Sequence, residues 1–303
     1  MVEVRGDWAF MKEVFHFPGW REKSLCCWRC TCTQDQIREV GADAPWRSSR
    51  LGHYDLMAKV LSNGHDWSAL FRAPWLSSEQ FKMDWLHVAD HGVSASFLGN
   101  VLWLVVKQLP GPNMGAQIAC LWERMQRFYA DHDVADRLTS LHRTMIRQQS
   151  KSPLLRASAA QVRALVPFCK DLAEQVLGNT PEKQAAKVAA AHLHACYRML
   201  ARDAPGDWQE TLSVSSRLFA SQLVALEASR TSVKFWKVSP KLHLFVELCS
   251  SGSKPSLCWT YRDEDFGGSC AHMARRRGGL LNCSGTSKSL LYRFMVGQPM
   301  IRL

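Results

Sequence analysis

A run of four cysteines, CCWRCTC, occupies residues 26–32. Within this run Cys27 and Cys30 are separated by two residues, a spacing that lets two thiolates reach one Zn²⁺ from a tight turn. The chain has no second pair with this spacing, so further ligands would be histidines, and His87 and His91 share one face of an expected helix. The sequence therefore predicts a structural zinc site at these four residues. The alternative is that the cysteines are small buried residues and the histidines are satisfied by hydrogen bonds.

Carboxylates at widely separated positions are the second candidate for chemistry. Cutting and joining phosphodiesters uses two divalent metal ions bridged by acidic side chains, and such acids commonly come from distant parts of a chain. Scattered acids are also found in every protein as solvated surface charge, so their presence alone does not decide between the two. The acids considered are Asp7, Asp84, Asp90, Asp263, Glu264 and Asp265.

A basic triplet follows the last of these acids, at Arg275, Arg276 and Arg277. The whole chain carries 38 Lys and Arg against 27 Asp and Glu, a formal net charge of +11. Such an excess favours polyanionic partners, nucleic acid first, and the triplet would contact DNA phosphates. The other interpretations of the triplet are a solvated helix end and a weak nuclear-import signal.

Cysteine usage and hydropathy indicate the compartment. The eleven cysteines are an odd number, and the polar N-terminus MVEVRGDWAF is not a secretory signal, which favours a reducing, intracellular and nuclear location. The most apolar stretch, residues 101–106, is far shorter than the ~20 residues of a membrane span, so no membrane association is expected.

The elements that would position these residues are mostly helical. A short strand is expected near residues 2–5, with Gly6-Asp7 at its exit, pairing with a second strand near 256–261. Residues 18–78 lack periodicity and indicate an irregular segment. A helix is then predicted at Met83–Leu109, and several more within 115–232. Among these, helices start after the caps Ser158 and Thr180-Pro181, and another spans Asp207–Ser229. A last helix is predicted after Ser239-Pro240.

Taken in order, several of these pieces resemble the catalytic domain of cut-and-paste DNA transposases of the CACTA and Plavaka-like groups. The resemblance covers roughly residues 1–110 and 233–279, and each of its motifs is short, so their order carries the weight. The motifs are Gly6-Asp7, the Cys27 and Cys30 pair, Asp84-x-x-His87 followed by Gly92-Val93, Pro240-Lys241-x-His243, and a late acid ahead of a helix.

The resemblance implies a DDE-type site that uses Mg²⁺ on an RNase H-like fold. Asp7 would match the second catalytic aspartate, and Glu264 would match the final acid, with Asp263 or Asp265 as substitutes. Cys27, Cys30 and His87 would match the cysteine pair and histidine that flank an insertion. The expected fold is α/β and helix-dominated: a partial RNase H-like core with a Cys-rich segment over 1–110, an all-α insertion over 111–232, and the rest of the core over 233–303.

Only six residues precede Asp7, so we expect the first strands and the first metal-binding acid of such a fold to be missing. The chain would then be a transposase-derived protein without strand-transfer activity that keeps some affinity for DNA, unless another chain supplies the missing part. One alternative is a non-enzymatic helical interaction protein with a zinc-stapled N-terminal segment. Another is an unrelated hydrolase whose pocket unites a nucleophile with a base.

Overall fold

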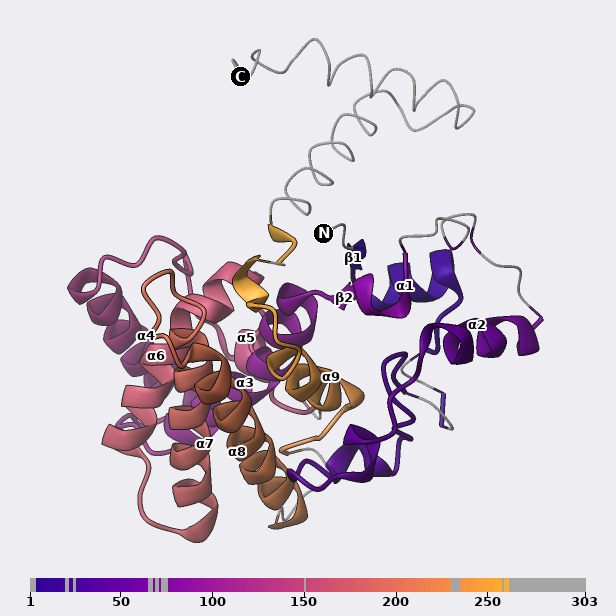
Figure 1. The fold of residues 1–303 in the computed structure, drawn as a ribbon. Coiled ribbons are helices and arrows are strands. Elements are labelled where there is room, and N and C mark those ends of the chain that lie inside the picture. The colour runs from indigo at the N-terminus through magenta and orange to yellow at the C-terminus, as the bar shows by residue number, and fades with distance from the viewer. Residues whose placement is uncertain are drawn as a thin grey trace, which may run out of the picture. The chain divides into compact units, whose positions relative to one another are not determined.

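The computed structural model describes residues 4–19, 22–23, 26–64, 68, 71, 76–149, 151–229, 235–257 and 259–261. Helices dominate this part of the chain, as expected (Figure 1). Met1–Trp259 forms one compact unit and Thr260–Leu303 a second one. The late acids Asp263, Glu264 and Asp265 and the triplet Arg275, Arg276 and Arg277 lie outside the described residues. The proposed division of the chain at residues 110 and 232 stays a prediction.

Two short strands form the sheet of the described part. Strand β1 (Val4–Gly6) pairs in parallel with β2 (Phe81–Met83), and the register places Gly6 opposite Met83. Phe81 and Met83 are buried while Lys82 is half-buried, which is the period-two pattern of a strand with one face in the core. The prediction of a partner strand near 256–261 was wrong for its first residues, because Pro255–Leu257 forms a 3₁₀ turn.

A long buried helix starts just after β2. Leu86–Ser94 is π-helical and continues without a break into α3 (Ala95–Val106). Helix α3 is buried on nearly all sides, which explains why its sequence is apolar throughout rather than amphipathic. The predicted helix over Met83–Leu109 is therefore confirmed apart from its ends. Wide π-helical turns are rare and are frequently found at functional sites.

The expected helical array is confirmed, together with its caps. Ser158 accepts a hydrogen bond from the Gln161 N–H and Thr180 one from the Lys183 N–H, so each satisfies a donor of the first helical turn. Helices α6, α7 and α8 lie side by side, α9 packs against α8, and α9 also packs against the π-helical segment (Figure 1). The bounds are α4 Met114–Asp131, α5 Arg143–Ile146, α6 Ala159–Val176, α7 Pro181–Arg198, α8 Trp208–Ser229 and α9 Pro240–Cys249.

The Cys-rich segment is irregular, as expected, and it follows the short helix α1 (Trp8–Phe15). A further helix, α2 (His53–Ser62), was not predicted. Two ion pairs join the segment to the helical array: Arg38 Nε lies 2.6 Å from Glu227 of α8, and Arg50 Nη1 lies 2.5 Å from Glu247 of α9. Both carboxylates are buried, so these pairs fix the segment against α8 and α9.

The backbone at Leu154 passes close to Gly99 of α3, and we therefore expect Gly99→Ala to be destabilising. A Cβ at Gly99 would lie 2.6 Å from the backbone N and Cα of Leu154, and backbone cannot rotate away as a side chain can. We expect a loss of about 2 kcal/mol in the free energy of unfolding, even though alanine favours helix over glycine. Denaturant unfolding measures the change. Gly206→Ala, where no atom lies within 4 Å of the added Cβ, is the matched control and should be near neutral; equal effects in the two variants would contradict the prediction.

Candidate metal centre and adjoining cleft

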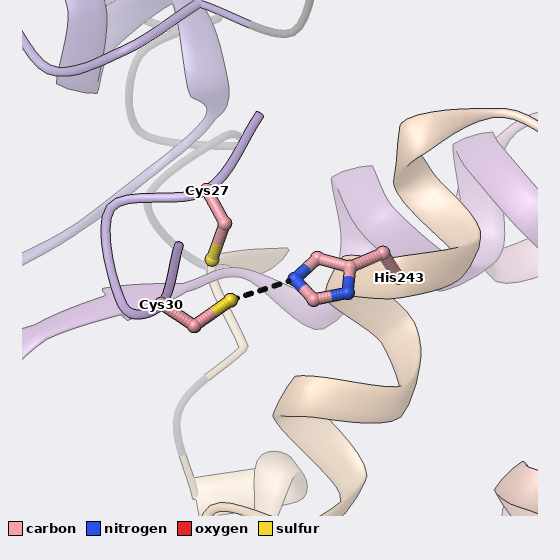
Figure 2. Close-up of side chains that lie close together, drawn as sticks. All are labelled: Cys27, Cys30 and His243. Carbon is pink, nitrogen blue, oxygen red and sulfur yellow. Dashed lines mark hydrogen bonds between the residues drawn. The ribbon is translucent and has the colours of Figure 1, made fainter. Parts of the chain in front are cut away.

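Three potential metal ligands meet in the core. The Sγ atoms of Cys27 and Cys30 and an imidazole nitrogen of His243 all lie within 4.8 Å of one another, and all three residues are fully buried. Cys30 Sγ and His243 Nε2 are 3.3 Å apart. Figure 2 shows both thiols pointing at the imidazole, the cysteines from a loop and the histidine from α9. Two sulfurs and one imidazole nitrogen are donors that suit Zn²⁺.

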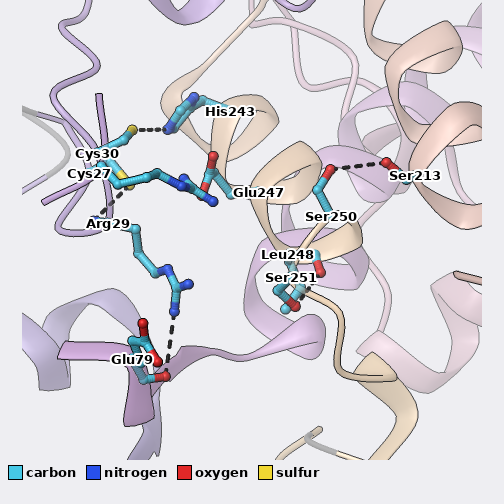
Figure 3. Close-up of polar contacts among 11 residues, drawn as sticks. Cys27, Arg29, Cys30, Glu79, Ser213, His243, Glu247, Leu248, Ser250 and Ser251 are labelled. Carbon is cyan, nitrogen blue, oxygen red and sulfur yellow. Dashed lines mark hydrogen bonds and ion pairs between the residues drawn. The ribbon is translucent and has the colours of Figure 1, made fainter. Parts of the chain in front are cut away.

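Local hydrogen bonds shape the cysteine loop. The Cys26 N–H donates to the Cys32 carbonyl at 2.9 Å, which closes the loop. The Arg29 N–H donates to Cys27 Sγ at 3.3 Å, so a backbone donor already supports negative charge on that sulfur. Arg29 also reaches the Glu79 carbonyl, just ahead of β2 (Figure 3). The loop is thus held in a form that presents both thiols to α9.

Burial sets the protonation of the thiols. It raises the pKa of Cys27 well above its ordinary value. For Cys30 the hydrogen bond with Cys27 lowers the pKa, but the hydrogen bond with Cys32 and burial outweigh it and raise the pKa to about 12. Zinc binds thiolates, so a metal ion here would replace these protons with its own positive charge.

The donor set passes a second test of fit. His243 Nε2 faces the two thiols and is the nitrogen that would bind the ion, while Nδ1 is buried with no hydrogen-bond partner among the residues that the structure describes. Glu247, one turn further along α9, accepts a hydrogen bond from Arg50 Nη1. Cys27, Cys30 and His243 would therefore hold the ion, with a fourth position for water or a further ligand.

The histidine in this group is not one of the two that sequence spacing suggested. His87 Nδ1 instead lies 2.6 Å from Asp84 Oδ2, and the rings of His87 and His91 are 6.3 Å apart on the π-helical segment. His243 had been noted only as the last residue of the motif Pro240-Lys241-x-His243. That motif was the one signal in the sequence that could have found it.

A cleft of about 620 Å³ is lined in part by the segments that follow Cys30 and precede His243 in the chain. Asp7 directly follows β1, lines the cleft, and accepts a hydrogen bond from the Phe10 N–H at 2.7 Å as the cap of α1. Asp84 directly follows β2. Because the strands are parallel and Gly6 is paired with Met83, the two aspartates follow neighbouring strands at the same edge of the sheet. The charged and polar residues that line the cleft are Asp7, Gln34, Asp35, Arg38, His87, Lys237, Ser239 and Lys241.

Asp84 contributes to the cleft indirectly, because it holds the side chain of His87. Its side chain is fully buried and accepts hydrogen bonds from the Leu86 and His87 N–H groups at 3.2 and 3.0 Å. In a neutral imidazole, a hydrogen bond from Nδ1 to the Asp84 carboxylate places the ring proton on Nδ1 and leaves the lone pair on Nε2. His87 lines the cleft, so the pair gives the cleft an imidazole in a defined tautomer.

Lys241 contributes a cation to the same cleft. Its Nζ donates to the His87 carbonyl at 2.8 Å. Burial lowers the pKa of Lys241, and the negative charge of Asp7 opposes that change. Asp7, directly after β1, and Lys241 of α9 thus influence each other electrostatically within the cleft.

The metal group and the cleft share their supporting elements. The loop that carries Cys27 and Cys30 continues into residues 34–38, which line the cleft, and α9 carries both Lys241 and His243. A metal ion bound at the group would therefore tie two walls of the cleft together.

No helix of the described residues is both long and apolar enough to span a bilayer. Comparisons with protein-family models, curated proteins and solved structures gave no match. The resemblance to transposases therefore stays a prediction from the sequence motifs.

Proposed function

We propose that this chain is a transposase-derived protein related to the RNase H-like catalytic domain of DNA cut-and-paste enzymes. Its cleft binds a divalent cation at Asp7 and the phosphodiester backbone of DNA. A structural zinc ion at Cys27, Cys30 and His243 holds the cleft walls together. The observation that carries the proposal is Asp7, which directly follows one of two paired parallel strands and lines the cleft together with Lys237 and Lys241.

The carboxyl ends of parallel strands are where folds of this type collect their functional residues. Acids placed there can hold Mg²⁺ against a phosphate, which is the arrangement that phosphodiester chemistry uses. Asp7 supplies one such carboxylate at the cleft. Glu264, with Asp263 or Asp265 as substitutes, stays the predicted final acid and lies outside the described residues.

The cations of the cleft fit the same substrate. Lys241 and Lys237 line it together with Asp7, so positive charge lies beside the proposed cation site. DNA phosphates bind to such mixed sites because lysines neutralise the backbone while the metal ion polarises one phosphate. The net charge of +11 favours the approach of DNA at the level of the whole chain.

Iron-directed cleavage would test the cation site. Fe²⁺ takes the place of Mg²⁺ at carboxylate sites, and with ascorbate and peroxide it cuts the polypeptide nearby. We expect cuts beside Asp7 and within the cleft segments 83–88 and 237–241, suppressed by excess Mg²⁺ and lost in Asp7→Asn. The protein is loaded with zinc beforehand, so that iron does not enter the cysteine site.

Asp207→Asn is the matched control, because Asp207 is an exposed aspartate far along the chain, directly before α8. It should leave the cuts unchanged. Cuts that persist in Asp7→Asn, or cuts that map away from the cleft, would refute a cation site at Asp7.

A zinc-stapled interaction protein without catalysis is the second candidate. It is favoured by the fact that both aspartates already serve the backbone: Asp7 caps α1, and Asp84 accepts two N–H groups. This candidate predicts bound zinc but no iron-directed cuts at the cleft, so the same experiment separates the two.

A further inference from the structure

A second cationic site lies away from the cleft, where three cations surround two aromatic rings. Lys107 Nζ lies 5.7 Å from the ring centre of Trp103 and 5.9 Å from that of Phe235. Arg147 Cζ lies 5.0 and 4.7 Å from the same two centres, and Arg143 Cζ lies 5.9 Å from Trp103. These five residues are called the Trp103 patch.

The patch is built from three separate parts of the chain. Trp103 is in the last turn of α3, with Lys107 just after it, while Arg143 begins α5 and Arg147 follows α5. Phe235 precedes α9. Trp103 is only 4% exposed, whereas Lys107 and Arg143 are exposed. Trp103 is therefore the buried part of the platform, Phe235 and Arg147 are half-buried, and Lys107 and Arg143 form the surface.

None of the three cations has a carboxylate partner within the part of the chain that the structure describes. Other cations do: Arg38, Arg50 and Lys170 are each paired with an acid at 2.5 to 3.1 Å. All three cations lie 5.0 to 5.9 Å from the ring centre of Trp103, so they are close enough to repel one another. Cation–π attraction offsets part of that cost. Folding alone does not explain why like charges gather here without an acid.

We propose that the Trp103 patch binds the phosphate backbone of duplex DNA. Guanidinium groups match phosphate oxygens with two parallel N–H donors, and the aromatic platform orients them in advance. A protein partner is less well suited, because Trp103, the largest apolar side chain of the patch, is buried and cannot act as an exposed anchor. The choice of DNA rests on the proposed function, whereas the site itself is independent of the cleft and of Arg275, Arg276 and Arg277.

The test is the salt dependence of binding to a linear duplex of mixed sequence, measured by fluorescence anisotropy. The triple variant Lys107→Gln, Arg143→Gln and Arg147→Gln removes three charges. We expect the slope of log Kobs against log salt to become shallower by about one unit for each lost phosphate contact, hence by about three. At low salt the affinity should fall at least about tenfold.

The matched control removes three exposed arginines elsewhere, Arg127→Gln, Arg198→Gln and Arg202→Gln, for the same change in net charge. Equal slopes in the two triple variants would show that only net charge matters and would overturn the patch. If the patch variant kept DNA binding and Asp7→Asn lost it, the patch proposal would also be overturned, while the cleft proposal would stand. If the protein bound anionic lipid vesicles but no DNA, both proposals would be refuted, because DNA is the partner in each.

Discussion

Removal of zinc is expected to lower the free energy of unfolding by about 4 kcal/mol, compared with the protein at a free zinc concentration about 1,000 times the Kd. The reason is that Cys27, Cys30 and His243 come together only in the folded chain, so the ion binds the folded state and not the unfolded one. Urea unfolding with and without a chelator measures the difference. Zinc content of the folded protein should be one ion per chain.

Three substitutions sharpen this prediction. His243→Ala and Cys27→Ser should abolish both the bound zinc and its effect on stability. His87→Ala should keep the zinc, because His87 is bonded to Asp84 and does not belong to the ligand group. This comparison distinguishes the site in the structure from the one that sequence spacing suggested.

Matched controls come from the helical array. Cys120→Ser changes a half-buried thiol on α4, and His192→Ala a half-buried imidazole on α7; both should retain the stabilisation by zinc. A chelator effect that is the same in wild type and in His243→Ala would contradict the metal centre. So would the loss of zinc in His87→Ala with the fold intact.

The helices were predictable because their signals are local. Ser158 and Thr180-Pro181 mark helix starts that depend on nothing outside one turn, and the structure confirms them. A strand near residues 2–5 with Gly6-Asp7 at its exit was also read from the chain itself, and β1 (Val4–Gly6) extends one residue further. Such features depend on capping and on periodicity, which a single sequence carries.

The missed features depend on pairing over long distances. Cys30 and His243 are 213 residues apart, and no periodicity connects a loop to a helix so far away. Strand β2 spans three residues directly before a helix, so its pattern merged with the helical one that starts at Met83. The metal ligand and the partner strand were therefore the parts that local reasoning could not place.

Asp84→Ala should lower the free energy of unfolding by about 3 kcal/mol, the second largest effect we expect. Three N–H donors point at this one buried carboxylate: the backbone N–H groups of Leu86 and His87, and His87 Nδ1. Loss of a helix cap costs about 1 kcal/mol. Leaving buried donors without an acceptor costs about 1 to 3 kcal/mol more.

Asp84→Asn separates this structural role from a catalytic one. An asparagine has one acceptor oxygen, and its NH₂ group would face donors where the second carboxylate oxygen now accepts. We therefore expect Asp84→Asn to cost about 2 kcal/mol as well, with a loss of the fixed Nδ1–H tautomer of His87 in NMR spectra. Asp207→Asn, at an exposed aspartate that accepts from the Thr211 hydroxyl, is the control and should change stability by less than about 0.5 kcal/mol.

The opposite outcome would reassign Asp84. If the charge of Asp84 served a bound cation rather than the N–H groups around it, the buried carboxylate would destabilise the protein when no cation is bound. Asp84→Asn would then leave the free energy of unfolding unchanged or raise it. Iron-directed cuts at the cleft would be lost in that variant at the same time. Destabilisation with cuts retained, as we expect, would make Asp84 the residue that holds His87 in place and would leave Asp7 as the carboxylate that meets the ion.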